Sequence, residues 1–318
     1  MASARRYAPW LAAVLLIALL FIAYERYASP PANFEGKTIV VIARGSTLPD
    51  VAHELVSAHV LAHPNSLRYL MRIAGLSGKI HAGPYLFEGP ENIFVIAYRL
   101  STGDWGLPPA RITFPEGLTV REMASKIEDA LPFVSAKAFL VAASSSEGVL
   151  FPDTYVFPPD ATAPLIVSTM RSTFDAKLAP LAGDIRASGR SLRDTVILAS
   201  LIEKEARTTE NRKLVAGILL NRLALGMPLQ VDAVFGYIFN RETYSPSLAD
   251  LKVNSPYNTY THAGLPPGAI DNPGMDALLA AIHPADTKYL YYLTDKNGVM
   301  HYATTYQEHL LNQQKFLK

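Results

Sequence analysis

Two glutamates lie close together in the apolar segment 195–206, which reads Thr-Val-Ile-Leu-Ala-Ser-Leu-Ile-Glu-Lys-Glu-Ala. Ser191, in the sequence Ser-Leu-Arg-Asp, predicts the start of a helix that runs to the end of this segment. At 100° per residue, Glu205 falls about 20° from Leu198, inside the apolar stripe of that helix. Glu203 falls about 140° away from Leu198. The pattern therefore predicts that Glu205 points toward apolar surroundings.

A carboxyl group in such surroundings has a raised pKa, because desolvation disfavours its charged form. A carboxylic acid that keeps its proton near neutral pH is what a general acid needs in order to protonate a glycosidic oxygen. The alternative is that the helix rolls at its end, so that Glu205 is solvated and pairs with Lys204 or Arg207. The pattern alone leaves both possibilities open.

The composition gives little support to other kinds of chemistry. The sequence has 318 residues and no Cys, which excludes thiolate zinc sites and Cys nucleophiles. Its 29 basic and 28 acidic side chains nearly cancel, so it has no basic field that would attract nucleic acid. His59 and His63 have the spacing of a helical metal site, but Pro64 ends that helix and no His-Glu-x-x-His motif is present. We predict no metal site and no nucleic-acid partner.

The N-terminal segment predicts a membrane anchor. Residues 7–24 are 18 consecutive uncharged residues, enough to cross a bilayer, and they follow the pair Arg5-Arg6. This pattern predicts a cytoplasmic tail at 1–6, a transmembrane helix at 7–24 and a linker at 25–36. The alternative is a cleaved signal peptide that ends near Ala28. In both interpretations the rest of the chain lies outside the cytoplasm.

A strand followed by an amphipathic helix is predicted twice, from Lys37 and again from Arg111. The two stretches match at a constant offset of 72 residues, so that Thr47 corresponds to Thr119. Two small strand–helix units are therefore expected.

In the first unit, a second helix at 65–74 and a strand from Ala82 give the order β-α-α-β. This order resembles a LysM module, and a generic small α+β domain is the alternative. We predict a LysM-like subdomain at 37–100.

Longer helical signals follow from Pro164 onward, and the region around 257–288 is rich in Pro, Gly, Tyr and Asn. The second domain is expected at 108–318 and includes the strand–helix unit 110–143. Its predicted elements are helices at 191–206, 211–225 and 305–316 and a strand pair at 289–293 and 300–303.

Several blocks of this region resemble one family. The sequences Ile-Leu-Ala-Ser-Leu-Ile-Glu-Lys-Glu-Ala and Val-Ala-Gly-Ile-Leu-Leu-Asn-Arg-Leu resemble the endolytic murein transglycosylases, also called the MltG or YceG-like family. Further similar blocks occur in the order of that family. The blocks cover residues 147–155, 197–206, 215–223, 226–230, 255–260, 264–270 and 280–284.

The resemblance implies an α+β chain with one N-terminal transmembrane helix, a LysM-like subdomain and a helix-rich, lysozyme-like catalytic domain with a small β element. It implies an enzyme that cleaves the β-1,4 bond between N-acetylmuramic acid and N-acetylglucosamine within glycan strands. Glu205 would protonate the leaving oxygen and then deprotonate the C6 hydroxyl of the muramoyl residue, which forms a 1,6-anhydro ring. This scheme needs no second carboxylate of equal importance.

The resemblance also suggests substrate-binding residues, each of which has a structural alternative. Asp232 would orient sugar hydroxyls or stabilise positive charge, or it would only cap a helix. Asn258 and Tyr260 would offer an amide and an aromatic face on a loop, or only turn chemistry. The remaining candidates for substrate binding are Gln230, Glu147 and Asp153. Asp153 with Thr154 would otherwise form only an Asx-type turn. The sequence departs from the family at Ala233, where Pro is common.

The implied partners are peptidoglycan glycan strands, the inner membrane through one helix, and peptidoglycan synthases such as penicillin-binding proteins. No cofactor is implied, and the catalytic part is expected in the periplasm. Two other interpretations remain. One is a catalytically silent glycan-binding scaffold, and the other is a muramidase that uses water as the nucleophile.

Overall fold

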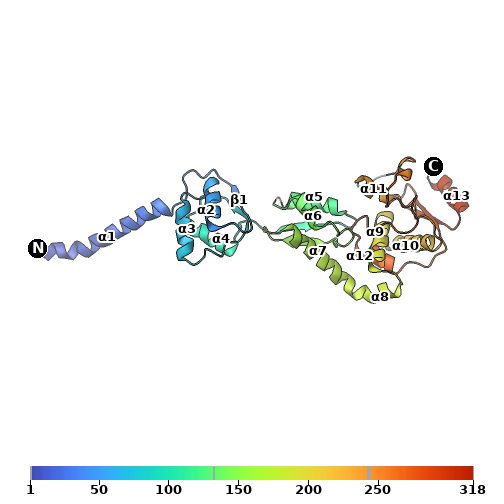
Figure 1. The fold of residues 1–318 in the computed structure, drawn as a ribbon, viewed down its shortest axis with the longest axis horizontal. Helices are drawn as coiled ribbons and strands as arrows, with labels where there is room; N and C mark the ends of the chain where they lie inside the picture. Colours follow the sequence, from blue (N-terminus) through green and yellow to red (C-terminus); the bar gives the residue numbers. More distant parts are fainter. Residues whose placement is uncertain (1, 132, 242–244, 318) are drawn as a thin grey trace. The chain divides into compact units, whose positions relative to one another are not determined.

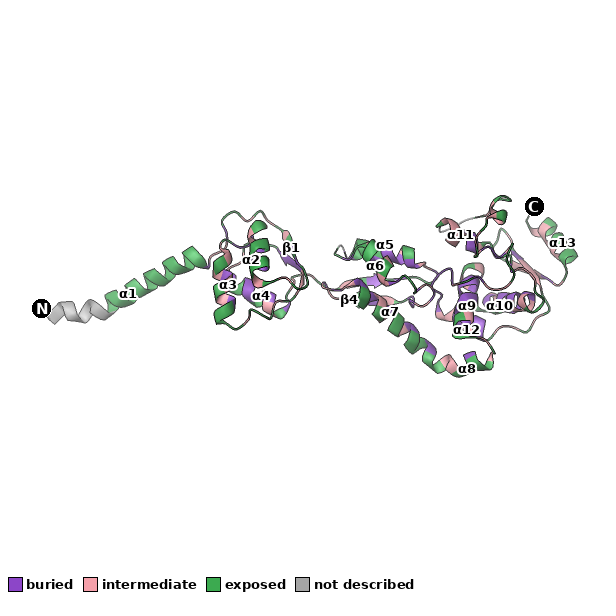
Figure 2. Cartoon of the chain, viewed as in Figure 1, coloured by how far each residue is buried: buried purple, intermediate pink, exposed green. Residues whose placement is uncertain are grey.

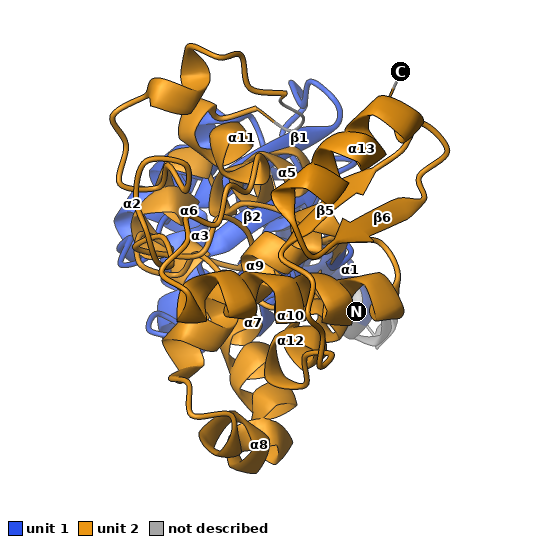
Figure 3. Ribbon diagram, turned by 90° about the vertical axis from the view of Figure 1, so that its right-hand side faces the viewer, with its two compact units in different colours: residues 1–110, 158–160 blue, residues 111–157, 161–318 orange. Residues whose placement is uncertain are grey.

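The computed structural model describes residues 2–131, 133–241 and 245–317. Residue 1 of the predicted tail and residues 132, 242–244 and 318 of the predicted catalytic domain lie outside the described residues. The chain divides into two compact units, coloured separately in Figure 3. Unit 1 comprises residues 1–110 and 158–160, and unit 2 comprises residues 111–157 and 161–318.

Unit 1 begins with the long helix α1 (Ala2–Tyr27). Residues Trp10–Tyr27 of α1 have a mean hydropathy of 1.7 and are entirely exposed, so this helix is long and apolar enough to cross a membrane (Figure 2). The same features also fit a signal sequence. The helix is therefore a candidate membrane segment, as the sequence predicts.

The remainder of unit 1 has the predicted β-α-α-β order and one further helix (Figure 1). The strands β1 and β2 pair antiparallel, with Thr38 opposite Phe87 and Ile42 opposite Gly83. The apolar sides of the helices bury Leu55, Leu67 and other residues against this pair. The elements are β1 (Thr38–Ile42), α2 (Leu48–Ser57), α3 (Pro64–Ile73), β2 (Gly83–Phe87) and α4 (Ile93–Thr102).

The repeat seen in the sequence corresponds to two equivalent helix starts. Thr47 caps α2 and Thr119 caps α5 (Val120–Ala130), and both caps are capping boxes closed by an acidic residue at the third helical position. Since these bonds satisfy N–H groups that the helix leaves unpaired, they fix where each helix begins. The predicted pair of strand–helix units is confirmed.

Unit 2 is richer in helices. The predicted strand pair and C-terminal helix are confirmed as β5, β6 and α13. The elements are β3 (Ala110–Thr113), α5, α6 (Ala136–Ala142), β4 (Thr154–Phe157), α7 (Ala163–Leu178), the 3-10 turn Ala179–Leu181, α8 (Ala182–Ala187), α9 (Leu192–Glu205), α10 (Thr209–Ala224), α11 (Ala233–Phe239), the 3-10 turn Asp250–Lys252, α12 (Met275–Ile282), β5 (Tyr291–Thr294), β6 (Met300–Ala303) and α13 (Tyr306–Phe316).

The core of unit 2 forms where α9 packs against α10 and α12. Every residue of α9 from Thr195 to Ile202 is buried, and the purple ribbon of α9 and α10 in Figure 2 marks this core. In the described part of the chain, the strands form three separate two-stranded sheets. The fold is therefore helix-rich α+β, as predicted. The finer comparisons with LysM and lysozyme stay predictions.

Candidate active site

The C-terminal turn of α9 carries Glu203 and Glu205 in two different environments. The Ser191 hydroxyl caps the start of α9 by accepting the Asp194 N–H at 3.0 Å. The helix ends at Glu205, and Ala206 continues in an extended conformation. Because the buried body of α9 is fixed between α10 and α12, the positions of both carboxyl groups are fixed as well.

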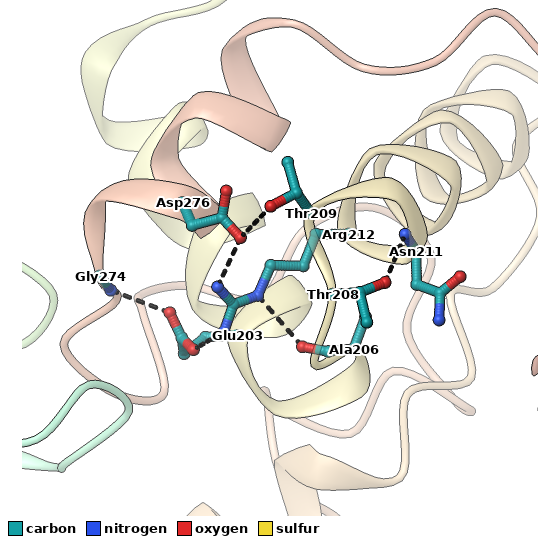
Figure 4. A network of polar contacts seen from close by, with 8 residues as sticks. All are labelled: Glu203, Ala206, Thr208, Thr209, Asn211, Arg212, Gly274 and Asp276. Carbon is teal, nitrogen blue, oxygen red and sulfur yellow. Dashed lines mark hydrogen bonds and ion pairs between the residues drawn. The ribbon is translucent and has the colours of Figure 1, made fainter. Parts of the chain in front are cut away.

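Glu203 is part of a buried network that holds three helices together (Figure 4). Arg212 of α10 donates one hydrogen bond to Glu203 and another, 2.8 Å long, to Asp276 of α12. The backbone N–H of Gly274 donates to the second Glu203 oxygen at 2.9 Å. Arg212 also donates to the carbonyl of Ala206 at 3.1 Å. Glu203 therefore ties α9 to α10 and α12.

Glu205 instead lines a cavity of about 860 Å³. The hydroxyl of Tyr292, in β5, donates a 2.9 Å hydrogen bond to Glu205 Oε2, and the backbone N–H of Ala233 also donates to this carboxyl group. Burial raises the pKa of Glu205 to about 7, and the charge of Asp232 acts in the same direction. The two hydrogen bonds oppose this rise. Glu205 thus holds a proton over a pH range where an exposed glutamate is ionised.

Asp232 lines the same cavity, directly before the first residue of α11. The hydroxyl of Tyr260 donates a hydrogen bond to Asp232 Oδ1. Burial raises the pKa of Tyr260, and the charges of Asp232 and Glu205 raise it further. Tyr260 therefore remains a phenol and a hydrogen-bond donor.

The carboxyl group of Glu147 also lines the cavity, beside α5. It accepts the Val120 N–H at 3.0 Å and a side-chain N–H of Asn272 at 3.0 Å. Burial raises its pKa to about 7, and the charge of Glu122 contributes to the rise. The cavity therefore has two carboxyl groups that gain or lose a proton near neutral pH.

Gly148 is what allows the Glu147 loop to approach α9 so closely. Its φ of +88° lies in a region that favours glycine, and a Cβ there would lie 2.7 Å from Val196 Cγ1 and 2.6 Å from Ala269 Cβ. No other residue fits this space without a shift of its neighbours.

Of the seven predicted site residues, the cavity wall includes Glu205, Asp232 and Glu147. Gln230 is exposed, and its side-chain oxygen accepts a hydrogen bond from Arg222. Tyr260 joins the wall indirectly, through its bond to Asp232.

Asn258 and Asp153 make contacts that shape the backbone. Asn258 is fully buried, and its side-chain amide donates to the carbonyls of Leu251 and Val253 at 3.0 and 2.9 Å. Its side-chain oxygen accepts the Tyr260 N–H at 3.0 Å. Asp153 is exposed and accepts the N–H of its neighbour Thr154 at 2.7 Å. These contacts agree with the structural alternative for Asn258 and Asp153, in which each side chain stabilises a turn.

The sequence did not point to Tyr292 or Arg222. Arg222 is buried, and its guanidinium lies 5.4 Å from the centre of the Tyr291 ring. Its charge opposes the rise in the pKa of both Tyr292 and Tyr260. The only signal for Tyr292 was its place in a tyrosine-rich strand, which the sequence alone does not connect to α9.

Other side chains of the cavity come from α5, α6 and the region around α11. The volume falls within the range of about 300–1,000 Å³ that is typical of ligand sites. No cluster of three His, Asp or Glu side chains that could hold a metal ion occurs among the described residues. The remaining lining residues are Thr119, Val120, Arg121, Glu122, Ser125, Leu140, Ala143, Ser144, Lys204, Ala233, Gly236, Tyr237, Asn240, Arg241, Ser245 and Ile270.

The fold and the site define a helix-rich α+β protein in which carboxylic acids face a ligand-sized cavity. A model of the YceG-like family matches residues 40–315, so the chain belongs to this family. The resemblance found in the sequence is thereby confirmed.

Named relatives agree with this assignment. The chain is 28% identical to an endolytic murein transglycosylase of Bacillus subtilis strain 168, over 92% of this chain and 89% of that protein. It is 27% identical to an endolytic murein transglycosylase of Streptococcus pneumoniae serotype 2 strain D39, over 87% of this chain. The matched part is 58% of that longer protein. These names associate the family with murein transglycosylases.

A solved structure is also similar. The crystal structure of a YceG-like protein from Listeria monocytogenes matches this fold with a TM-score of 0.61 and 28% sequence identity. The match covers 86% of this chain and 98% of that one.

Proposed function

We propose that this protein is a lytic transglycosylase that cleaves the β-1,4 bond between N-acetylmuramic acid and N-acetylglucosamine within peptidoglycan glycan strands. The observation that carries the proposal is the Glu205 carboxyl group, which lines a ligand-sized cavity with a pKa of about 7. The names of the relatives in Bacillus and Streptococcus support the choice of substrate.

In the first step, protonated Glu205 gives its proton to the glycosidic oxygen as the bond from that oxygen to the muramoyl C1 breaks. The N-acetylglucosamine part leaves with a free 4-hydroxyl, and positive charge develops at C1 and the ring oxygen. Asp232 lies on the same wall as the acid, and a carboxylate there stabilises this charge.

In the second step, the Glu205 carboxylate takes the proton of the muramoyl C6 hydroxyl. The C6 oxygen then bonds to C1 and closes the 1,6-anhydro ring. Glu205 ends the cycle protonated, and no water is consumed. Tyr292 serves both steps, since its hydrogen bond to Oε2 holds the carboxyl group in one orientation.

The remaining predicted residues serve substrate binding in this proposal. Tyr260 positions Asp232, and Asn258 shapes the loop of Tyr260. Glu147 accepts hydrogen bonds from sugar hydroxyls at the α5 side of the cavity. Gln230 is exposed beside Asp232 and contacts the glycan strand there. Asp153 stabilises the Phe-Pro-Asp-Thr turn near Glu147.

We assign the enzyme to the inner membrane, with α1 as a single anchor, the N-terminus in the cytoplasm and the remainder in the periplasm. Residues 37–100 would form a LysM-like unit that contacts glycan, and residues 108–318 would form the catalytic domain. Peptidoglycan synthases are the proposed protein partners, because new glycan strands are the substrate that an endolytic enzyme would shorten.

Mass spectrometry of the muropeptides released from purified peptidoglycan by the full chain in detergent tests this proposal. Anhydro-muramic ends are the expected product. Reducing ends would instead identify a muramidase that uses water. In that case Glu147 would act as the base that activates the water. Absence of any product, with peptidoglycan binding retained, would identify a scaffold.

A further inference from the structure

The end of α1 is attached firmly to the rest of unit 1. Ala28, the residue after α1, is buried in the core of unit 1, and its carbonyl accepts the Ile93 N–H at 3.2 Å. Arg26 Nη1 lies 3.1 Å from His63 Nε2. Asn33 Nδ2 lies 2.8 Å from His59 Nδ1. The segment predicted as a linker at 25–36 therefore packs against unit 1.

This attachment determines how far α4 can lie from a bilayer that α1 crosses. The 18 uncharged residues 7–24 rise by about 1.5 Å each, or about 27 Å in total, which matches a hydrocarbon core of about 30 Å. Ala28 then falls in the headgroup layer, which is about 5–7 Å thick on each side. Because Ile93 contacts Ala28, the first turn of α4 lies in or next to the same layer.

The outer face of α4 is unusually apolar for a helix at the surface. Phe94, Val95 and Tyr98 are exposed by 53%, 40% and 62%. The one charged residue of α4, Arg99, is buried and pairs with Glu91 at 2.7 Å. A helix that is apolar on all sides is normally covered by something else.

The outer faces of α2 and α3 are more polar, since α3 exposes Tyr69 and Ile73 beside Asn65 and Arg72. The exposed side of α2 carries Asp50, His53, Glu54 and Ser57, as expected for a face that meets water. Among α2, α3 and α4, only α4 has an outer face without an exposed charged residue, and its first residue is bonded to the end of the membrane segment.

We infer that the outer face of α4, beginning at Phe94, is a lipid-contacting surface that seats unit 1 on the bilayer. Aromatic side chains favour the boundary between headgroups and acyl chains, so Phe94 and Val95 enter this boundary while the Tyr98 hydroxyl stays among the headgroups. This inference rests on the proposed role of α1 as a membrane anchor. Its consequence is that unit 1 has one fixed orientation on the membrane and does not swing on a flexible linker.

Site-directed spin labelling of the full chain in phospholipid vesicles tests the inference. The chain has no Cys, so each single-cysteine variant carries one label. Phe94→Cys tests the proposed surface, Glu54→Cys is the control for a side chain in water, and Leu16→Cys reports whether α1 is in the bilayer. The vesicles contain phosphatidylethanolamine and phosphatidylglycerol. The measured quantity is the ratio of collisions with oxygen, which concentrates in lipid, to collisions with a water-soluble nickel chelate.

The ratio at position 94 is expected to be several-fold higher than at position 54 and to approach that at position 16. A ratio at 94 equal to that at 54, with position 16 in lipid, would overturn the inference and leave the anchor intact. An aqueous ratio at position 16 would overturn the anchor, and the inference with it. Label–label broadening at 94 that disappears when the protein is diluted would identify a second copy as the occupant and would also overturn it. Val95→Cys repeats the measurement at a second exposed site of the same turn.

Discussion

The hydrogen bond from Tyr292 to Glu205 gives the most quantitative prediction, tested by the substitution Tyr292→Phe. The bond is 2.9 Å long and favours the charged form of the carboxyl group. A hydrogen bond to a charged acceptor contributes about 1.5–3 kcal/mol, whereas one to a neutral acceptor contributes about 0.5–1.5 kcal/mol. The difference, about 1–1.5 kcal/mol, corresponds to about one pKa unit.

Loss of this bond should therefore raise the pKa of Glu205 from about 7 to about 8. Because Glu205 must be protonated in the first step, activity in the parent protein should fall as the pH rises through about 7. In Tyr292→Phe this fall should move about one unit to higher pH. The maximal rate should drop about 10- to 100-fold, because the carboxyl group is no longer held in one orientation.

The assay is the initial rate of release of anhydro-muropeptides between pH 5 and 9. Tyr291→Phe is the matched control, because neighbouring residues of a strand point to opposite sides. This control should leave the pH dependence unchanged. A Tyr292→Phe protein that is folded and has the pH profile of the parent would refute the assignment of Glu205 as the acid held by Tyr292.

Three further predictions follow from the same site. In Asp232→Asn the pKa of Glu205 should decrease, since a repelling charge is removed, so the fall in activity should move to lower pH, opposite to Tyr292→Phe. Glu205→Gln should stabilise the fold at pH 8 by about 3 kcal/mol relative to the parent, measured by urea unfolding. The pKa of Glu205 is raised from 4.5 to about 7 on folding, so the parent loses stability as the pH rises from about 4.5 through about 7. Gly148→Ala should destabilise the fold by about 2–4 kcal/mol in the same assay, through the contacts with Val196 and Ala269 and the positive φ.

Each of these has a result that contradicts it. A shift to higher pH in Asp232→Asn would mean that the Asp232 charge does not act on Glu205. Equal stability of Glu205→Gln and the parent at pH 5 and pH 8 would mean that Glu205 is solvated. A Gly148→Ala protein as stable as the parent would mean that the Glu147 loop lies farther from α9.

Elements with local signals could be predicted from the sequence. The capping residues Thr47, Thr119 and Ser191 each mark a helix start, because the bonds they make are to residues three positions later. The strand pair predicted at 289–293 and 300–303 corresponds to β5 (Tyr291–Thr294) and β6 (Met300–Ala303). α4 was not predicted, since its apolar residues lack the polar face that makes a helical period recognisable.

The environments of the two glutamates of α9 could be predicted only in part. The helical wheel separated Glu203 from Glu205, but it did not predict that Glu203 would be buried too. That burial depends on Arg212 of α10 and on the backbone N–H of Gly274, which donate hydrogen bonds to Glu203 from distant parts of the sequence. The Tyr292 bond spans 87 residues of sequence, and no local pattern reports a contact at that distance.

A comparison of Glu205→Gln with Glu203→Gln shows whether Glu205 is the acid that cleaves the glycan strand. Purified peptidoglycan is incubated with each full-length variant, and the released muropeptides are identified by mass spectrometry. The folded fraction of each variant is measured by circular dichroism, because Glu203→Gln weakens a buried ion pair. If Glu205 is the acid, folded Glu205→Gln should give no anhydro-muramic products and folded Glu203→Gln should retain a measurable rate. Anhydro-muramic products from Glu205→Gln at the rate of the parent would contradict this role of Glu205.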